Sequence, residues 1–151
     1  MIPVLLVMML LLVQPGIILY DRIVMESAAA EGCRLLATKN DVAGDMTASC
    51  EAFIRHRLSS VPPQSCFHVH EGSCSWNIQM EGDESSDRVK VAIENQVKPL
   101  PLLDAGCTLL GLVNGEGNLV IRVERTMAVQ PDWVAHAPAG QSPANWPGAW
   151  L

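Results

Sequence analysis

The first 20 residues of the chain are apolar almost without interruption. Met1 to Tyr20 contains no charged side chain and no histidine, and its only polar side chains are those of Gln14 and Tyr20. About 20 residues rising ~1.5 Å each cross a hydrocarbon layer of ~30 Å, and soluble helices rarely stay apolar on every face for this length. Residues 1–20 are therefore predicted to be a transmembrane helix.

A cleaved signal peptide is the alternative interpretation of this segment. Small residues of the cleavage-site type follow it at Ser27 to Ala30. Against cleavage, no basic residues precede the apolar run, and the charged pair Asp21-Arg22 separates it from the alanines. We therefore expect the segment to remain as a membrane anchor.

Apolar positions at helical spacing continue past the segment, so one helix is predicted to extend to about Thr38. One face is formed by Tyr20, Val24, Ala28 and Leu35, and a neighbouring face by Ala29, Cys33 and Leu36. Ala28 and Gly32 are small residues four positions apart, a spacing that lets two helix backbones approach closely. The alternative is that the alanines are present only because alanine is a strong helix former.

A second helix is predicted from Asp45, a suitable N-cap residue, to about Ser59. Its apolar face consists of Met46, Cys50, Phe53, Ile54 and Leu58. A turn at 39–44 precedes it, and Val61-Pro62-Pro63 ends it. This helix is expected to lie antiparallel to the end of the first, so that residues 21–60 form a helical hairpin.

Beyond residue 66 the apolar positions recur with a period of two, which is typical of strands with one buried face. Three strands are predicted around Trp76 to Glu81, Val89 to Glu94 and Leu119 to Glu124, and a short fourth at Cys66 to His70. The fold class is α+β: a long N-terminal helix, a second short helix, an antiparallel sheet of three or four strands, and an irregular tail rich in Pro and Trp. The expected divisions are 1–20, 21–60, 61–130 and 131–151.

Six leucines lie in the segment Lys98 to Val113, which Pro99 and Pro101 interrupt. The favoured interpretation is a loop with a helical turn that covers one face of the sheet. Packing is favoured because large exposed apolar patches are uncommon, and an exposed contact with another subunit is the alternative.

Composition and motifs exclude several functions. The net charge is -6 and the ten Lys and Arg residues are scattered, so nucleic-acid binding is not indicated. We find no nucleophile elbow, P-loop or dinucleotide fingerprint, and we predict no catalytic residue, no cofactor and no small-molecule substrate. His68 and His70, with Glu71 or His136, are the best metal candidate, but the spacing supplies too few ligands and no metal site is predicted. The acidic stretch Asp83-Glu84 is interpreted as a solvated turn.

Five cysteines without a C-x-x-C pair indicate disulfides in an oxidising compartment. Cys33 and Cys50 lie equally far from the turn at 39–44, so an antiparallel hairpin is expected to bring them within disulfide distance. The same symmetry about His70 predicts a bridge between Cys66 and Cys74. Cys107 is then left unpaired.

The start of the chain resembles a known family. Its residues Ile2 to Leu6 (IPVLL), then Gly16-Ile17-Ile18, then Tyr20-Asp21-Arg22, and then Met25 to Arg34 (MESAAAEGCR) resemble the TadE-like pseudopilins of bacterial tight-adherence (Flp-type) pilus systems. The resemblance covers about the first quarter of the chain. It implies a non-enzymatic pilin-like subunit that acts in pilus assembly, with other pilin-like subunits or pilus assembly proteins as partners. It also implies a single pass through the bacterial cytoplasmic membrane with the C-terminal domain outside, or a location outside the cell within a pilus.

One departure from the family concerns its usual segment just upstream of the proline. That segment carries Gly, Thr, Val and Glu, with a prepilin-type cleavage site or the acidic residue that pairs with a neighbouring subunit's amino terminus. Here Met1 lies inside the apolar helix. We expect either that the assigned start is too late or that this member is not processed.

A second function from a different class stays open on the sequence alone. The chain could be a membrane-tethered or secreted small binding domain unrelated to pili, with the sheet as a ligand platform and the first helix as a passive anchor. A signal-peptide n-region upstream of Ile2 would favour that alternative.

Overall fold

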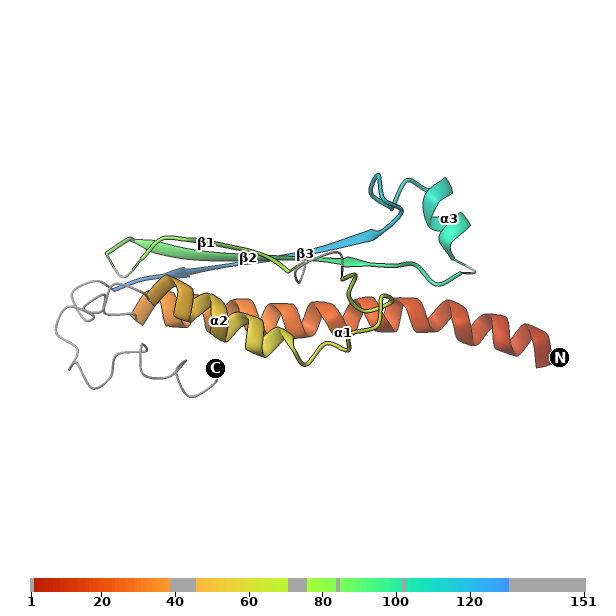
Figure 1. The fold of residues 1–151 in the computed structure, drawn as a ribbon, viewed down its shortest axis with the longest axis horizontal. Helices are drawn as coiled ribbons and strands as arrows, with labels where there is room; N and C mark the ends of the chain where they lie inside the picture. Colours follow the sequence, from red (N-terminus) through yellow and green to blue (C-terminus); the bar gives the residue numbers. More distant parts are fainter. Residues whose placement is uncertain (1, 39–45, 71–75, 84, 102, 131–151) are drawn as a thin grey trace. The chain divides into compact units, whose positions relative to one another are not determined.

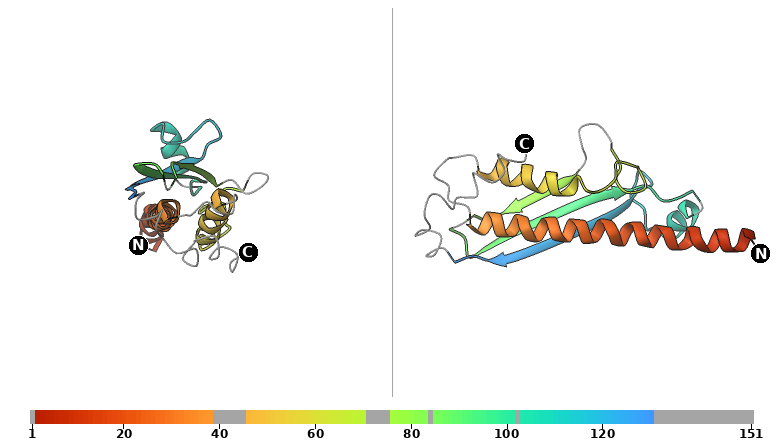
Figure 2. Two further views of the ribbon diagram at one scale, coloured as in Figure 1. Left: turned by 90° about the vertical axis from the view of Figure 1, so that its left-hand side faces the viewer. Right: turned by 90° about the horizontal axis from the view of Figure 1, so that it is seen from below.

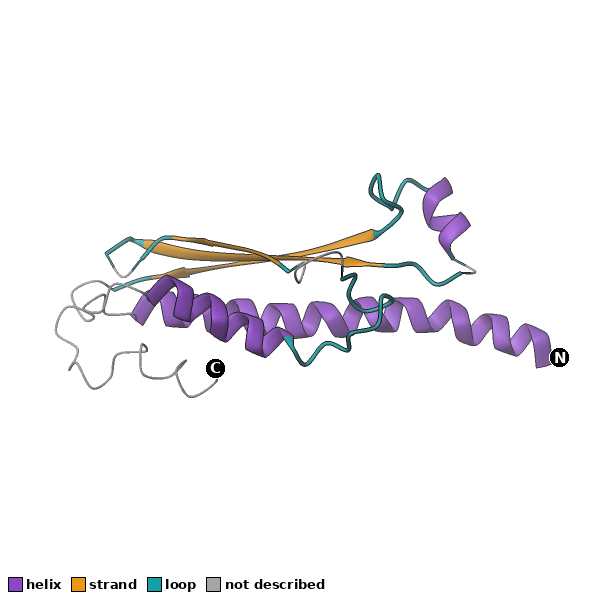
Figure 3. Ribbon diagram, in the orientation of Figure 1, coloured by secondary structure: helices purple, strands orange, loops and turns teal. Residues whose placement is uncertain are grey.

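The computed structural model describes residues 2–38, 46–70, 76–83, 85–101 and 103–130. Along these residues it has three helices, α1 (Ile2–Thr38), α2 (Met46–Leu58) and α3 (Asp104–Leu109), and three strands, β1 (Asn77–Glu81), β2 (Arg88–Val97) and β3 (Leu119–Ala128). The elements can be followed by label in Figure 1 and by type in Figure 3. The strands form one antiparallel sheet in the order β1-β2-β3, and Figure 2 shows them side by side. The α+β class predicted from the sequence is therefore confirmed.

Helix α1 has the extent that the periodicity predicted, ending at Thr38. Its 37 residues correspond to a length of about 55 Å at ~1.5 Å per residue. Contacts within the chain divide the fold into two units. One contains Met1–Ile23, Val61–Asn77 and Glu94–Arg122, and the other contains Val24–Ser60, Ile78–Ile93 and Val123–Leu151. Helix α1 and strands β2 and β3 each contribute to both units.

The unit that begins at Val24 has an apolar core. Side chains from the second half of α1, from α2 and from the first half of β2 are fully buried in it: Met25, Ala29, Leu36, Ile54, Leu58, Val89, Val91 and Ile93. The alternation in β2 is the predicted one, with every second side chain buried, except that Ala92 on the other face is buried as well. Burial of such side chains contributes about 1.5–3 kcal/mol each, so this core is the main source of stability in this unit.

The unit that begins at the N-terminus has a more polar interior. Its buried apolar side chains include Ile17, Trp76, Val97 and Ile121. Five of the polar side chains described in this unit are also buried: Gln14, Asp21, His68, Asn95 and Asn118. Buried polar groups are costly unless they are hydrogen-bonded, so this interior depends on specific pairings.

The fourth strand predicted at Cys66 to His70 is not a strand. The segment nevertheless follows the end of β2, because the Val69 amide donates to the Gln96 carbonyl at 2.8 Å and the Lys98 amide donates to the Ser65 carbonyl at 2.8 Å. Two hydrogen bonds without a regular ladder do not constitute a strand. The three-stranded form of the prediction is the correct one.

The turn between β1 and β2 requires glycine at its start. Gly82 has a φ of 88°, and a Cβ at this position would lie 2.5 Å from the Arg88 carbonyl oxygen. The Asp83 carboxylate then accepts hydrogen bonds from the hydroxyls of Ser85 and Ser86 and from the Ser85 amide, and these bonds lower its pKa to about 2. Asp83 is therefore a turn residue, as the sequence indicated.

The predicted packing of the segment 98–113 against the sheet is wrong for its last leucines. Helix α3 has no buried residue, and Leu109, Leu110 and Leu112 are 90%, 72% and 58% exposed. A six-residue helix is too short to present a continuous apolar stripe, and the backbone leaves it through Gly111 at a φ of 66°. The predicted turn at 39–44, the Asp45 cap and the tail 131–151 lie outside the described residues.

Candidate functional site: the stem helix

The N-terminal part of α1, from here called the stem (residues 2–23), exposes apolar side chains on all faces over its first three turns. Every side chain from Ile2 to Val13 is exposed, and the values for the large apolar ones range from 39% at Val13 to 78% at Ile2. A patch of this kind requires lipid or protein to cover it. In the described part of the chain α1 is the one helix long and apolar enough to cross a membrane, with a mean hydropathy of 2.5 in its most apolar window.

From Gln14 onward, one face of the stem packs against its own chain. Gln14, Ile17 and Asp21 are buried at spacings of three and four residues, which places them on one helical face. The Gln14 side-chain oxygen accepts a hydrogen bond from the Leu100 amide at 2.8 Å. The Tyr20 ring meets the ring of Phe67 edge to face, with centroids 6.1 Å apart. A polar contact therefore holds Leu100, and an aromatic contact holds Phe67, against the stem.

Asn95 links the stem to the loop before β1. Its amide nitrogen donates to the Phe67 carbonyl at 2.8 Å and lies 3.4 Å from the Asp21 carboxylate. Its amide oxygen lies 2.6 Å from His68 Nδ1. Among the described residues the other Asp21 oxygen and His68 Nε2 are buried without a hydrogen-bond partner.

His68, the sequence's best metal candidate, is part of this buried cluster. Its ring stacks on Trp76 at a centroid distance of 4.2 Å and meets His70 edge to face at 4.4 Å. Burial lowers the pKa of His68, only partly offset by the hydrogen bond to Asn95. No group of three His, Cys, Asp or Glu side chains that could hold a metal occurs in the described ranges, and Glu71 and His136 lie outside them.

The two small residues proposed for helix packing, Ala28 and Gly32, are buried within their own unit. A Cβ on Gly32 would lie 2.7 Å from Ile54 Cδ1 on α2 and 3.5 Å from Val91 Cγ2 on β2. The close approach at Gly32 is thus made to α2 and β2 of the same chain. The small residues of this part of α1 that are exposed are Ser27 and Ala30.

The predicted Cys33–Cys50 disulfide is absent. Cys33 is a free thiol that donates a hydrogen bond to the Arg125 carbonyl on β3 at 3.3 Å. The hairpin symmetry failed because the face of α1 that carries Cys33 is turned toward the sheet. Cys66 and Cys107 are also free thiols, and Cys74, the predicted partner of Cys66, lies outside the described residues.

The polar contacts of Gln14, Asp21 and Asn95 were not predicted from the sequence. A signal was present, because Gln14 and Asp21 interrupt an apolar helix seven residues apart and therefore share a face. Asn95 gave a further signal, because it continues the buried face of Val89, Val91 and Ile93, where a polar side chain needs a hydrogen-bond partner.

A long helix with an exposed apolar start, followed by an α+β domain, fits the class of single-pass membrane proteins. Within that class, residues 1–34 match the family model described as TadE-like protein, which confirms the resemblance found in the sequence. The match lies entirely on α1. No curated protein and no solved structure matches the chain.

Proposed function

We propose that this protein is a non-enzymatic, pilin-like subunit that acts in the assembly of a tight-adherence type pilus. The observation that carries the proposal is the coincidence of two features on one segment: residues 1–34 match the TadE-like family, and residues 2–13 of the same helix expose apolar side chains on every face. A helix of this kind is stable in a bilayer before assembly and against other apolar helices afterward.

The proposed location follows from the same segment. The protein is held in the bacterial cytoplasmic membrane by residues 1–20, with the C-terminal domain on the outer side, and it enters the pilus or its priming complex from there. Its partners are other pilin-like subunits or pilus assembly proteins. Protease treatment of spheroplasts tests the orientation, because an outer domain is digested while the membrane remains sealed.

The deciding experiment permutes residues 2–13, so that their order changes while their composition stays the same. A permuted segment has the same length and hydropathy, so a passive anchor tolerates it, whereas a helix that packs against other stems loses its side-chain complementarity. The readouts are membrane fractionation, which is expected to be unchanged, and the number of pili on cells, which is expected to fall to the level of the gene deletion. As the matched control, Glu116→Gln alters an exposed side chain outside the stem and is expected to preserve piliation.

Two outcomes would contradict the proposal. Normal piliation of the gene deletion would separate the protein from pilus assembly altogether. Normal piliation with the permuted segment would make the stem a passive anchor, as in the alternative of a membrane-tethered binding domain.

A further inference from the structure

The strongest feature that the proposed function does not use is the exposed apolar segment around α3. Pro99 to Val113 contains a single charged residue, Asp104, and lies between the charged residues Lys98 and Glu116. Leu109 and Leu110 are among the most exposed large apolar side chains of the described residues. A patch of this kind on a folded domain indicates a partner.

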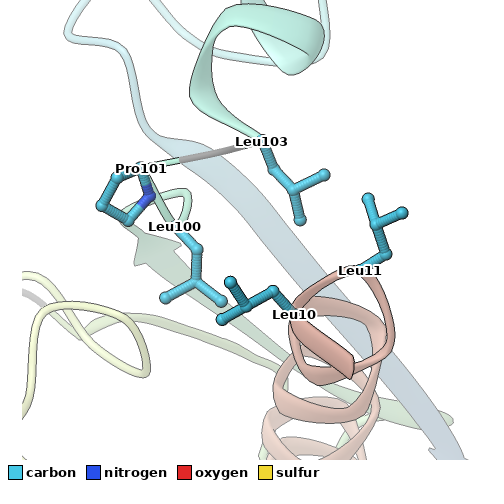
Figure 4. A pocket seen from close by; sticks show the side chains of 5 residues that line it. All are labelled: Leu10, Leu11, Leu100, Pro101 and Leu103. Atoms are coloured by element: carbon cyan, nitrogen blue, oxygen red, sulfur yellow. The ribbon is translucent and has the colours of Figure 1, made fainter. Parts of the chain in front are cut away.

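The structure fixes this segment beside the stem. Gln14 on the stem accepts a hydrogen bond from the Leu100 amide, and an apolar cavity of about 220 Å³ is lined by Leu10, Leu11, Leu100, Pro101 and Leu103. Figure 4 shows the leucines of the stem and those of the segment pointing toward one another across this cavity. Contact between the stem and the rest of the chain thus begins about halfway along the apolar run.

The length of the apolar run indicates how deep in the membrane the contact between the stem and this segment lies. As a helix, residues 1–20 rise about 30 Å, which equals the thickness of a hydrocarbon layer. If residues 1–20 cross the membrane, Leu10 to Gln14 lie inside the hydrocarbon layer. The segment held against them is then at the same level, on the side of the folded domain.

We propose that the segment around α3 is a second membrane-contacting element, whose described leucines and the cavity that they share with the stem are covered by lipid acyl chains of the leaflet on the domain side. The proposal rests on the membrane insertion of residues 1–20 assumed in the proposed function. Continuity with the stem selects lipid as the partner, because the same acyl chains that surround Leu11 and Leu12 reach α3. Lys98, at one end of the segment, is exposed and placed to reach the headgroups.

Site-specific photocrosslinking in nanodiscs of phosphatidylethanolamine and phosphatidylglycerol tests this proposal. The crosslinking amino acid p-benzoyl-phenylalanine is placed at position 110, at position 5 or at position 116, one at a time in the full chain. Leu110 and Leu5 are matched, being 72% and 70% exposed, and Glu116 is an exposed polar control just outside the segment. Position 112 serves as a second test site, at 58% exposure.

The expected result, read by mass spectrometry, is a lipid adduct at positions 5, 110 and 112 and none at 116. An adduct at position 5 alone would overturn the proposal and leave the single membrane pass intact. A covalent dimer through position 110 would overturn it in favour of a second copy of this chain. An adduct at position 116 with the same yield as at positions 110 and 112 would also overturn the proposal, because the segment would then contact lipid no more than the surface outside it does. Adducts at none of the positions would overturn it together with the membrane insertion on which it rests. Pilus assembly is not read out here, so these outcomes are independent of the permuted-stem experiment.

Discussion

His68 Nδ1 lies 2.6 Å from Asn95 Oδ1, and both side chains are buried. The Asn95 nitrogen is already placed as a donor to the Phe67 carbonyl, so its oxygen accepts and His68 donates from Nδ1. Neutral His68 then leaves Nε2 without a proton. This pairing fixes both the orientation of the amide and the tautomer of the ring.

The first prediction concerns Asn95. Asn95→Ala leaves the Nδ1 proton of His68 and the Phe67 carbonyl without their partner, and each unsatisfied buried group costs about 1–3 kcal/mol. We expect a loss of about 2–4 kcal/mol in the free energy of unfolding, measured by denaturant titration in detergent micelles. Asn77→Ala, at an exposed position, is the control and should change stability by less than about 0.5 kcal/mol. Equal effects of the two variants would contradict the pairing.

The second prediction is that His68 contributes a loss of stability in mild acid, whereas Asp21, whose pKa burial raises to about 7, contributes a gain over the same range. Burial lowers the pKa of His68 below its ordinary value of 6.5. As the pH falls through 6.5, the unfolded chain takes up a proton at this residue while the folded chain does not, so unfolding becomes more favourable. The stability of His68→Gln relative to the unmodified protein is expected to rise as the pH falls from 7.5 to 5, whereas the relative stability of His56→Gln, at an exposed position on α2, should stay constant. An unchanged slope in His68→Gln would mean that other groups cause the effect.

The elements that could be predicted from the sequence are those in which the spacing of apolar residues determines the secondary structure. The extent of α1 and the alternation of Val89, Val91 and Ile93 follow from periods of 3.6 and two, and the structure confirms both. Periodicity identifies a buried face but not what covers it. The Cys33–Cys50 pairing failed for this reason, since it assumed that the face of α1 carrying Cys33 meets α2.

The contacts around the stem were harder to predict, because they join segments far apart in the chain. Gln14 and Leu100 are separated by 86 residues, and Asp21 and Asn95 by 74. The exposure of Leu109 and Leu110 was only the less favoured of two interpretations, since a leucine-rich segment of a folded domain is ordinarily buried. Their exposure could be interpreted only once the structure showed that the same segment lies beside the apolar stem.

A third prediction compares two glycines with positive φ. Gly82→Ala puts a Cβ into the left-handed region and 2.5 Å from the Arg88 carbonyl oxygen, whereas Gly117→Ala, at a φ of 78°, meets nothing within 4 Å. The conformational cost of about 1 kcal/mol applies to both, and the collision applies to Gly82 alone. We expect Gly82→Ala to lower the free energy of unfolding by at least about 1–2 kcal/mol more than Gly117→Ala does. Similar losses would show that the β1–β2 turn relaxes without cost.

The fourth prediction concerns the Cys33 thiol. Burial raises its pKa, and the thiolate is the reactive form, so alkylation by iodoacetamide should be slow in the folded protein and fast after unfolding. Cys66, which is half-buried, is the internal control and should react sooner in the folded protein. Mass spectrometry of the digested, non-reduced protein measures both. A peptide pair linked through Cys33 and Cys50 would contradict the structure.

The last prediction tests the close contact between α1 and α2 with a double-mutant cycle. Gly32→Ala gains about 1 kcal/mol of helix propensity but places a Cβ 2.7 Å from Ile54 Cδ1 and 3.0 Å from Ile54 Cγ1, in a side chain that is fully buried and cannot move freely. Overpacking of this kind costs about 1–3 kcal/mol, so the single variant is expected to be neutral to moderately destabilised. Ile54→Val removes Cδ1 and costs about 0.5–1.5 kcal/mol alone.

Because the missing Cδ1 relieves the shorter contact, the double variant should be more stable than the sum of the single changes by at least about 0.5 kcal/mol. Gly16→Ala, on the same helix with nothing within 4 Å of the added Cβ, is the control and should show no coupling to Ile54→Val. Strict additivity of Gly32→Ala and Ile54→Val would show that the two helices do not meet at this point.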